Sequence, residues 1–152
     1  VDKTNEAQKL QIVKKIKSYF NNNLQDKTLA ILGLSFKPKT SDVRESPALN
    51  IIPELIKLGA KIQAYDPIAT CEAKENIPKE FHENISFCDS MEDSIKDSNA
   101  IVLLTEWDEF RSLNFREISK VMKEKVIFDG RNIYEPEIII EDGFKYVGMG
   151  RR

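Results

Sequence analysis

The sequence predicts an α/β fold: a Rossmann-like three-layer sandwich with a mostly parallel sheet of about six strands, preceded by an N-terminal helix. Short apolar runs alternate along the chain with segments whose apolar residues recur every three or four positions. Several of these runs are apolar at every position, which is typical of strands covered by helices on both faces. Polar motifs follow directly after four of the runs, where a parallel sheet places its ligand-binding loops.

The first predicted helix covers residues 6–22 and has two apolar faces. One stripe repeats at helical spacing, and Ile12 and Tyr19 extend it to a second face. Packing on the domain's own sheet and packing on something outside the domain are equally consistent with this pattern. We expect the helix to expose apolar surface that another domain or a partner covers, and we expect the chain to be a fragment of a longer protein.

The remaining predicted elements follow in alternation. The predicted strands are residues 29–34, 61–65, 85–88, 100–104, 126–128 and 144–147. The predicted helices are residues 48–58, 91–96 and 115–122, with a polar, helix-compatible stretch ending near residue 81. Ser46-Pro47 marks a helix start, because Ser accepts from free N–H groups and Pro suits the first turn. Pro53 lies beyond that turn, so the pattern is consistent with a kink or with a later start.

Composition and charge exclude several classes of protein. The chain has 152 residues, enough for one domain with a sizeable core, and a net charge of -2 that provides no overall attraction for nucleic acid. No apolar run approaches the roughly 20 residues that a membrane-spanning helix needs. The two cysteines, Cys71 and Cys88, do not form a disulfide framework, so a reduced, cytoplasmic setting is expected.

A long basic loop follows the first strand and is the main candidate for a ligand site. Residues 35–47 include Lys37, Lys39 and Arg44 and exceed a typical strand-to-helix connection. In a doubly wound sheet, Lys37 and Arg131 approach each other at the switch point, with Phe36 nearby, which suits a nucleotide carrying phosphate. Solvated charges, or ion pairs with Asp42, Glu45 and Asp129, explain the same basic residues slightly better from spacing alone.

Other reaction centres find little support in the sequence. The segment GLSFKP contains one glycine where the dinucleotide fingerprint requires three, so this domain is not expected to cradle NAD itself. Neither cysteine has an activating neighbour, and a single histidine, His82, provides neither a zinc site nor a supported general base. Asp66 is more consistent with capping its turn than with binding a ribose, and Trp107 with packing than with stacking on a ligand.

Four motifs in register resemble the UDP-glucose/GDP-mannose dehydrogenase family. In chain order they are GLSFKP with TSDVRESP at 33–47, YDP at 65–67, TEW at 105–107 and FDGRN at 128–132. The matching region is similar to the C-terminal, nucleotide-sugar-binding domain of that family. Members of the family oxidise the sugar C6 alcohol to a carboxylate in two NAD-dependent steps, through intermediates bound to a cysteine.

The resemblance implies roles for four residues. Phe36, Lys37 and Arg131 are expected to contact a UDP-sugar, with UDP-glucose as the expected substrate. Arg44 matches the arginine that reaches towards NAD on the other domain. No residue of this chain matches the catalytic cysteine motif, so no catalytic residue and no metal ligand is assigned, and the chain alone is expected to be inactive.

The resemblance also implies a domain layout and partners. Residues 1–24 correspond to the end of the family's central linking helix and residues 25–152 to the UDP-sugar-binding domain. A homodimer is expected for the full-length protein, with NAD held mainly by an N-terminal domain. Three alternatives remain open: a GDP-mannose dehydrogenase, a UDP-N-acetylhexosamine dehydrogenase, and a non-catalytic nucleotide-binding or oligomerisation module.

Overall fold

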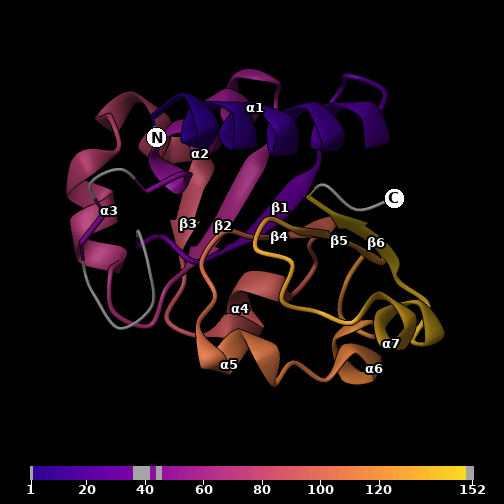
Figure 1. The fold of residues 1–152 in the computed structure, drawn as a ribbon. Helices are drawn as coiled ribbons and strands as arrows, with labels where there is room; N and C mark the ends of the chain where they lie inside the picture. The colour runs from indigo at the N-terminus through magenta and orange to yellow at the C-terminus, as the bar shows by residue number, and fades with distance from the viewer. Residues whose placement is uncertain (1, 36–41, 44–45, 150–152) are drawn as a thin grey trace.

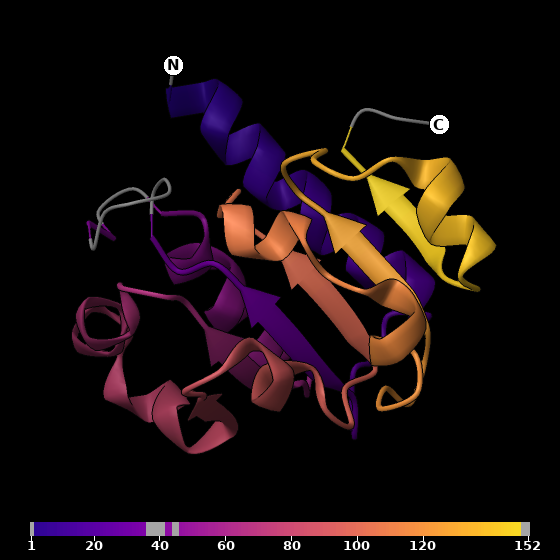
Figure 2. The same cartoon turned by 90° about the horizontal axis from the view of Figure 1, so that it is seen from below.

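Six parallel strands form the centre of the molecule, as the sequence predicts. The computed structural model describes residues 2–35, 42–43 and 46–149, with the side chains of the first helix described from Gln11 onward. The strands are β1 (Thr28–Leu32), β2 (Lys61–Tyr65), β3 (Ile85–Phe87), β4 (Ala100–Leu103), β5 (Val126–Asp129) and β6 (Lys145–Gly148). Their order is β3-β2-β1-β4-β5-β6, and every neighbouring pair is parallel. Figure 2 shows the strand arrows pointing towards one edge.

The strand order creates one switch point, between β1 and β4. The chain leaves β1 and builds outward to β2 and β3, then returns to pair β4 with the other side of β1. Leu32 lies opposite Tyr65 on one side and Leu103 on the other. The loops after β1 and β4 therefore begin side by side, which is where sheets of this kind bind ligands.

Helices cover both faces of the sheet (Figure 1). One face carries α1 (Asp2–Tyr19), α2 (Ala48–Lys57) and α3 (Thr70–Asn76), followed by the 3₁₀ turn η1 (Lys79–Asn84). The other carries α4 (Met91–Ile95), α5 (Asp108–Arg111), α6 (Phe115–Ile118) and α7 (Pro136–Glu141). The three layers follow from the all-apolar strands, because each strand must bury side chains on both faces.

Alternation along the strands divides the core into two clusters. Leu29 and Ile31 of β1 join the cluster under α1 and α2, whereas Ala30 and Leu32 join the cluster under α4 to α7. All four of these side chains are fully buried. The period of two places successive residues on opposite faces, so one short strand contributes to both clusters.

Helix α1 packs on the domain's own sheet. Ile12, Val13 and Ile16 are between 0% and 9% exposed and belong to the same cluster as the β1 residues. On the second face, the ring of Tyr19 lies edge-on to Phe128 of β5, with centroids 5.9 Å apart. The prediction that this helix exposes apolar surface is therefore wrong for the side chains that the structure describes, because α1 fills the part of this face that α2 and α3 leave open.

Differences from the predicted elements lie between the strands. Helix α2 begins directly after Ser46-Pro47 and runs through Pro53, which confirms the predicted start and rules out the later one. The helix predicted for 115–122 ends at Ile118. The short helices α5 and α7 were not predicted, because one or two turns show little of the helical period.

Candidate functional site

The candidate site is the carboxyl edge of the sheet around the switch point. Four segments meet there: the residues after β1, the Asp66 turn after β2, the stretch 104–107 after β4, and the loop 130–132 after β5. Each segment carries one of the motifs found in the sequence. The parallel arrangement brings together residues that are separated by up to about a hundred positions in the chain.

The carboxylate of Asp66 connects three of these segments. Its Oδ1 accepts hydrogen bonds from the backbone N–H of Ile68 and Ala69, at 2.9 and 2.7 Å, which caps the following turn. Its Oδ2 accepts from the backbone N–H of Leu34 and Ser35, at 2.8 and 3.1 Å. Asp66 is 4% exposed. The capping interpretation is therefore confirmed, and the ribose interpretation is wrong, because protein donors already occupy both oxygens.

Trp107 packs into the same network. Its indole Nε1–H donates to Asp66 Oδ2 at 3.3 Å, and the residue is 9% exposed within the cluster under α5. A side chain buried to this extent offers no face to a ligand, so the packing interpretation holds. The TEW motif thus fixes the loop after β4 onto the turn after β2.

Thr105 joins the loops after β4 and β1 directly. Its hydroxyl donates to the carbonyl oxygen of Ser35 at 2.8 Å. Gly33 has φ +103°, and a Cβ built on it would lie 2.5 Å from the Cβ of Thr105. A glycine is needed at this position both for the backbone conformation and for the close approach of the two loops.

Arg131 is held at the edge by two acidic residues. The fully buried carboxylate of Asp129 accepts from the backbone N–H of Arg131 through Oδ1, at 3.1 Å, and from the Tyr146 hydroxyl through Oδ2, at 2.9 Å. The guanidinium itself pairs with Glu106: Nε donates to Oε2 at 3.0 Å and Nη2 to Oε1 at 3.1 Å. The prediction that Arg131 is simply solvated or paired with Asp129 is thus wrong about its partner, since Asp129 holds its backbone and Glu106 its side chain.

The other predicted site residues lie outside the described residues. Phe36, Lys37 and Arg44 belong to this group, as do Lys39 and Glu45, so the structure does not test whether Lys37 approaches Arg131. Residues flanking them are well anchored. Val43 is 3% exposed and belongs to the core cluster under α2. Ser46 is 1% exposed, and its hydroxyl accepts from the backbone N–H of Ala48 at 3.2 Å.

The tyrosine before Asp66 has a perturbed pKa. The pKa of Tyr65 is raised to about 12, mainly by burial and secondly by the hydrogen bonds from its hydroxyl to Glu109. Burial and the charge of Asp129 also raise the pKa of Tyr134, whose hydroxyl donates to the carbonyl of Phe110 at 2.6 Å. Both phenols therefore remain neutral near pH 7 and act as structural donors.

Among the described residues, the hydrogen bonds that connect the four motifs involve neither the thiols nor the histidine. Burial, followed by the charges of Asp93 and Asp89, raises the pKa of the Cys88 thiol, which disfavours the reactive thiolate. Cys71 is exposed on α3, and the ring of His82 bonds to the carbonyl of Ile77 at 2.9 Å. Within the described ranges, no group of three or more His, Cys, Asp or Glu side chains could hold a metal ion.

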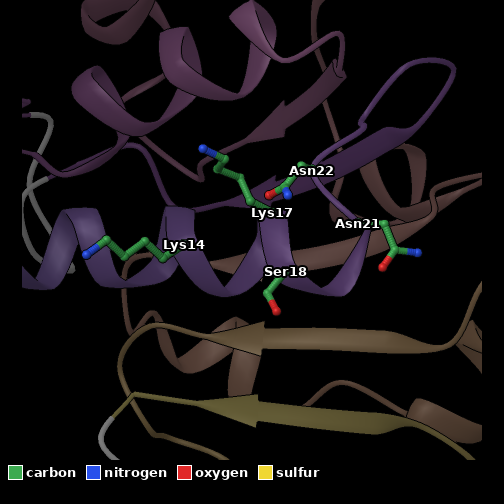
Figure 3. Close-up of a pocket in the computed structure, with 5 residues that line it drawn as sticks. All are labelled: Lys14, Lys17, Ser18, Asn21 and Asn22. Carbon is green, nitrogen blue, oxygen red and sulfur yellow. The ribbon is translucent and has the colours of Figure 1, made fainter.

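A shallow pocket at the end of α1 lies at the opposite edge of the sheet (Figure 3). It has a volume of about 350 Å³ and is lined by Lys14, Lys17, Ser18, Asn21 and Asn22. The turn that contains the two asparagines leads directly into the amino end of β1. This pocket therefore does not communicate with the motifs at the carboxyl edge.

Sequence comparison identifies the family. The sequence model of the UDP-glucose/GDP-mannose dehydrogenase family, UDP binding domain, matches residues 30–136, a segment that contains all four edge motifs. The chain belongs to this family. It is 38% identical over its whole length to the UDP-glucose 6-dehydrogenase of Rickettsia conorii, and 37% identical over 99% of its length to UDP-glucose 6-dehydrogenase TuaD of Bacillus subtilis. It spans about a third of these relatives, 34% and 32% of their lengths.

A solved structure has the same fold. The UDP-D-ManNAc dehydrogenase of Pyrococcus horikoshii matches 95% of this chain with a TM-score of 0.71 and 30% sequence identity, and the match covers 30% of that protein.

None of the helices that the structure describes in this chain is both long and apolar enough to cross a membrane.

The sequence contains two acidic residues of the site, Glu106 and Asp129, but their contacts were not predicted. Glu106 lies within the TEW motif, but its pairing with Arg131 depends on the adjacency of β4 and β5, which the motif alone does not contain. Asp129 precedes Arg131 in the FDGRN motif, and its position at the last residue of a buried strand was the available signal. A buried carboxylate at a strand end usually supports a loop, because burial without hydrogen-bond donors is costly.

Proposed function

We propose that this chain is the nucleotide-sugar-binding C-terminal domain of a UDP-glucose 6-dehydrogenase. The enzyme converts UDP-glucose to UDP-glucuronate by two successive NAD-dependent oxidations at C6. The names of the two relatives described above support this substrate. Because the chain spans only about a third of them, the oxidation itself is assigned to the longer protein.

The observation that carries the proposal is the position of Arg131. It lies at the carboxyl edge, in the loop after β5, with its backbone fixed by the buried Asp129 and its side chain 38% exposed. A partly exposed, immobilised guanidinium suits a diphosphate, because its planar fork matches two phosphate oxygens. Phe36 and Lys37 complete the proposed binding group, as the family motif implies.

NAD does not fit the described residues of this chain. A dinucleotide cradle needs free backbone N–H groups after the first strand. Here the N–H groups of Leu34 and Ser35 donate to Asp66, and the space beside Gly33 is filled by Thr105. We therefore assign NAD mainly to an N-terminal domain, with Arg44 as the residue of this chain that reaches it.

The chain by itself is proposed to be inactive, with no catalytic residue of its own. The family's catalytic cysteine motif has no counterpart here, and the raised pKa of Cys88 opposes its use as a nucleophile. Its part in the reaction is to bind and orient the nucleotide so that the sugar is positioned for chemistry elsewhere.

The proposed context follows from the family. Residues 1–24 form the end of the central linking helix and residues 25–152 the UDP-sugar-binding domain. The full-length enzyme is a cytoplasmic homodimer that supplies UDP-glucuronate for polysaccharide biosynthesis. The packing of Ile12 and Ile16 on the sheet supports a rigid connection between the linking helix and this domain.

A UDP-N-acetylhexosamine dehydrogenase is the second candidate. The likeness to the UDP-D-ManNAc dehydrogenase of P. horikoshii, at 30% identity, supports it. Both candidates share the UDP group, which is the part of the substrate that this domain binds. The two candidates differ in the sugar, which is the part of the substrate that is oxidised outside this domain.

Competition between nucleotides and nucleotide sugars tests the proposal. The chain is titrated with uridine, UDP and GDP and followed by two-dimensional amide NMR, in which weak binding remains measurable. UDP should shift the signals of residues at the carboxyl edge, including Arg131, while uridine and GDP should bind more weakly. In the full-length protein, oxidation rates with UDP-glucose, UDP-N-acetylglucosamine, UDP-N-acetylmannosamine and GDP-mannose then separate the candidates. Equal binding of GDP and UDP would contradict the UDP assignment.

A further inference from the structure

The ion pair between Glu106 and Arg131 has a specific geometry. The two oxygens of Glu106 accept from Nε and Nη2, at 3.0 and 3.1 Å, so the carboxylate occupies one edge of the planar guanidinium. The Arg131 and Glu106 side chains are 38% and 29% exposed. Two parallel hydrogen bonds fix the rotation of the guanidinium as well as its position.

Both partners have immobilised backbones. Glu106 stands between Thr105, which donates to the Ser35 carbonyl, and Trp107, which donates to Asp66. The backbone N–H of Arg131 donates to the buried Asp129. Holding an ordinary surface pair in one geometry costs side-chain entropy, which leaves most such pairs with little net stabilisation. Here the anchored backbones reduce that cost, so the pair is a pre-organised element of the edge.

The pairing leaves a defined part of the guanidinium available. Arginine has five N–H donors, and Glu106 takes the Nε–H and one on Nη2. Within the part of the chain that the structure describes, these are the hydrogen bonds of this side chain. The outer edge, formed by Nη1 and the second N–H of Nη2, has the spacing that two oxygens of one phosphate require.

We propose that Glu106 is a positioning residue that orients the outer edge of Arg131 towards the diphosphate of the nucleotide. This inference rests on the proposed function, since it names the residue that prepares Arg131 for the ligand. Glu106 acts through Arg131 and does not itself bind the nucleotide. It selects for a ligand with a phosphate over one that offers only a base and a ribose.

An opposite role for Glu106 predicts an opposite result. A carboxylate that competes with phosphate for the same guanidinium would weaken nucleotide binding, and its removal would strengthen that binding. The pairing through Nε and Nη2 favours positioning, because a competitor would occupy the outer edge that a phosphate needs. The sign of the change in affinity therefore decides between the two roles.

The experiment is a double-mutant cycle measured with UDP and with uridine. The variants are Glu106→Gln, Glu106→Asp, Arg131→Ala and the double variant Glu106→Gln/Arg131→Ala, with Glu117→Gln as the control. Glu117 is an exposed glutamate on α6 that pairs with Lys120 at 3.4 Å. Amide NMR spectra without ligand verify that each variant keeps the fold.

Positioning predicts a distinct pattern across the cycle. Glu106→Gln should weaken UDP binding by about three- to tenfold, the effect of one lost hydrogen bond, and Glu106→Asp by less. Glu106→Gln should have no further effect when Arg131 is already alanine, and it should leave uridine binding and the Glu117→Gln control unchanged. A merely structural role would affect uridine as much as UDP.

The failures are distinguishable. Unchanged or tighter UDP binding by Glu106→Gln, with Arg131→Ala still weakened, would overturn the positioning role alone. The positioning role would also be overturned if the two effects added, that is, if Glu106→Gln weakened UDP binding as much in the Arg131→Ala variant as in the unaltered chain. No binding of UDP by the unaltered chain would refute the proposed function and this inference together.

Discussion

Ser35 donates twice to the carboxylate of Asp66, through its backbone N–H at 3.1 Å and through its hydroxyl at 3.2 Å. Thirty-one positions separate the two residues, and both are buried. The contact joins the end of β2 to the first residues after β1, where the long basic loop begins. The start of that loop is therefore held by protein hydrogen bonds before any ligand arrives.

Replacing Asp66 with asparagine should destabilise the fold and weaken UDP binding. The amide retains one acceptor oxygen but turns an NH₂ group towards donors, which leaves buried N–H groups of Leu34 and Ser35 or of Ile68 and Ala69 unsatisfied. We expect a loss of about 2–4 kcal/mol in the free energy of unfolding, measured by urea denaturation. Asp89→Asn, at an exposed position, should change it by less than about 0.5 kcal/mol. Similar losses in both variants would contradict this role of Asp66.

Alanine at position 33 tests the close approach of the loops after β1 and β4. Gly33 and Gly143 both have positive φ, +103° and +91°, but a Cβ on Gly143 would come no closer than 3.7 Å, to the flexible Lys125 side chain. Gly143→Ala should cost about 1–2 kcal/mol from backbone strain alone. Gly33→Ala adds a clash with Thr105 and should cost about 3 kcal/mol or more, by thermal or urea unfolding. Equal costs would show that the approach to Thr105 is unimportant.

Much of the fold could be predicted because the relevant signals are local. The strands that carry Leu29, Ile101 and Val126 are short apolar runs, and Ser46-Pro47 and Gly59 mark the ends of one helix. Helix α7 escaped prediction because Ile138–Ile140 is a continuous apolar run, without the spacing of a helix. Two of these side chains, Ile138 and Ile140, are 58% exposed, so the apolar run does not indicate a buried element either.

The site was less predictable because its contacts are long-range. Motifs identified Arg131 and the turn at Asp66, since each follows a strand. The bonds from Asp66 to Leu34 and from Arg131 to Glu106 depend on which strands are neighbours. The burial of α1 was not predicted because amphipathic spacing shows that a face is apolar and does not show what covers it.

Alkaline pH should destabilise the protein through Tyr65. The pKa of this phenol is raised from 10.0 to about 12 in the folded state, so its stabilising contribution is complete below pH 10 and is lost as the pH rises from 10 to 12. In that window it lowers the free energy of unfolding by at most about 1.4 kcal/mol per pH unit. Tyr65→Phe should make urea denaturation less steeply dependent on pH there. An unchanged dependence would contradict the raised pKa.

Thiol alkylation should show that the two cysteines react at different rates and that neither thiol is activated. Cys71 is exposed and should react first with iodoacetamide, whereas Cys88 is partly buried with a raised pKa and should react more slowly. Mass spectrometry of the chain, with Cys71→Ser and Cys88→Ser as references, assigns the sites. Rapid reaction of Cys88 at pH 6 would indicate an activated thiol and contradict the proposed absence of a nucleophile in this chain.

Binding of UDP by the unaltered chain, by Arg131→Ala and by Arg116→Ala tests the central claim most directly. Arg116→Ala is a matched control because it removes the same charge at a different position. The Arg116 side chain is 81% exposed and pairs only loosely with Asp142, at 3.8 Å. Calorimetry or amide NMR should give at least about tenfold weaker binding for Arg131→Ala, the loss of a charge-assisted bidentate contact, and unchanged binding for Arg116→Ala. Equal affinities in all three proteins would contradict the assignment of this edge as the nucleotide site.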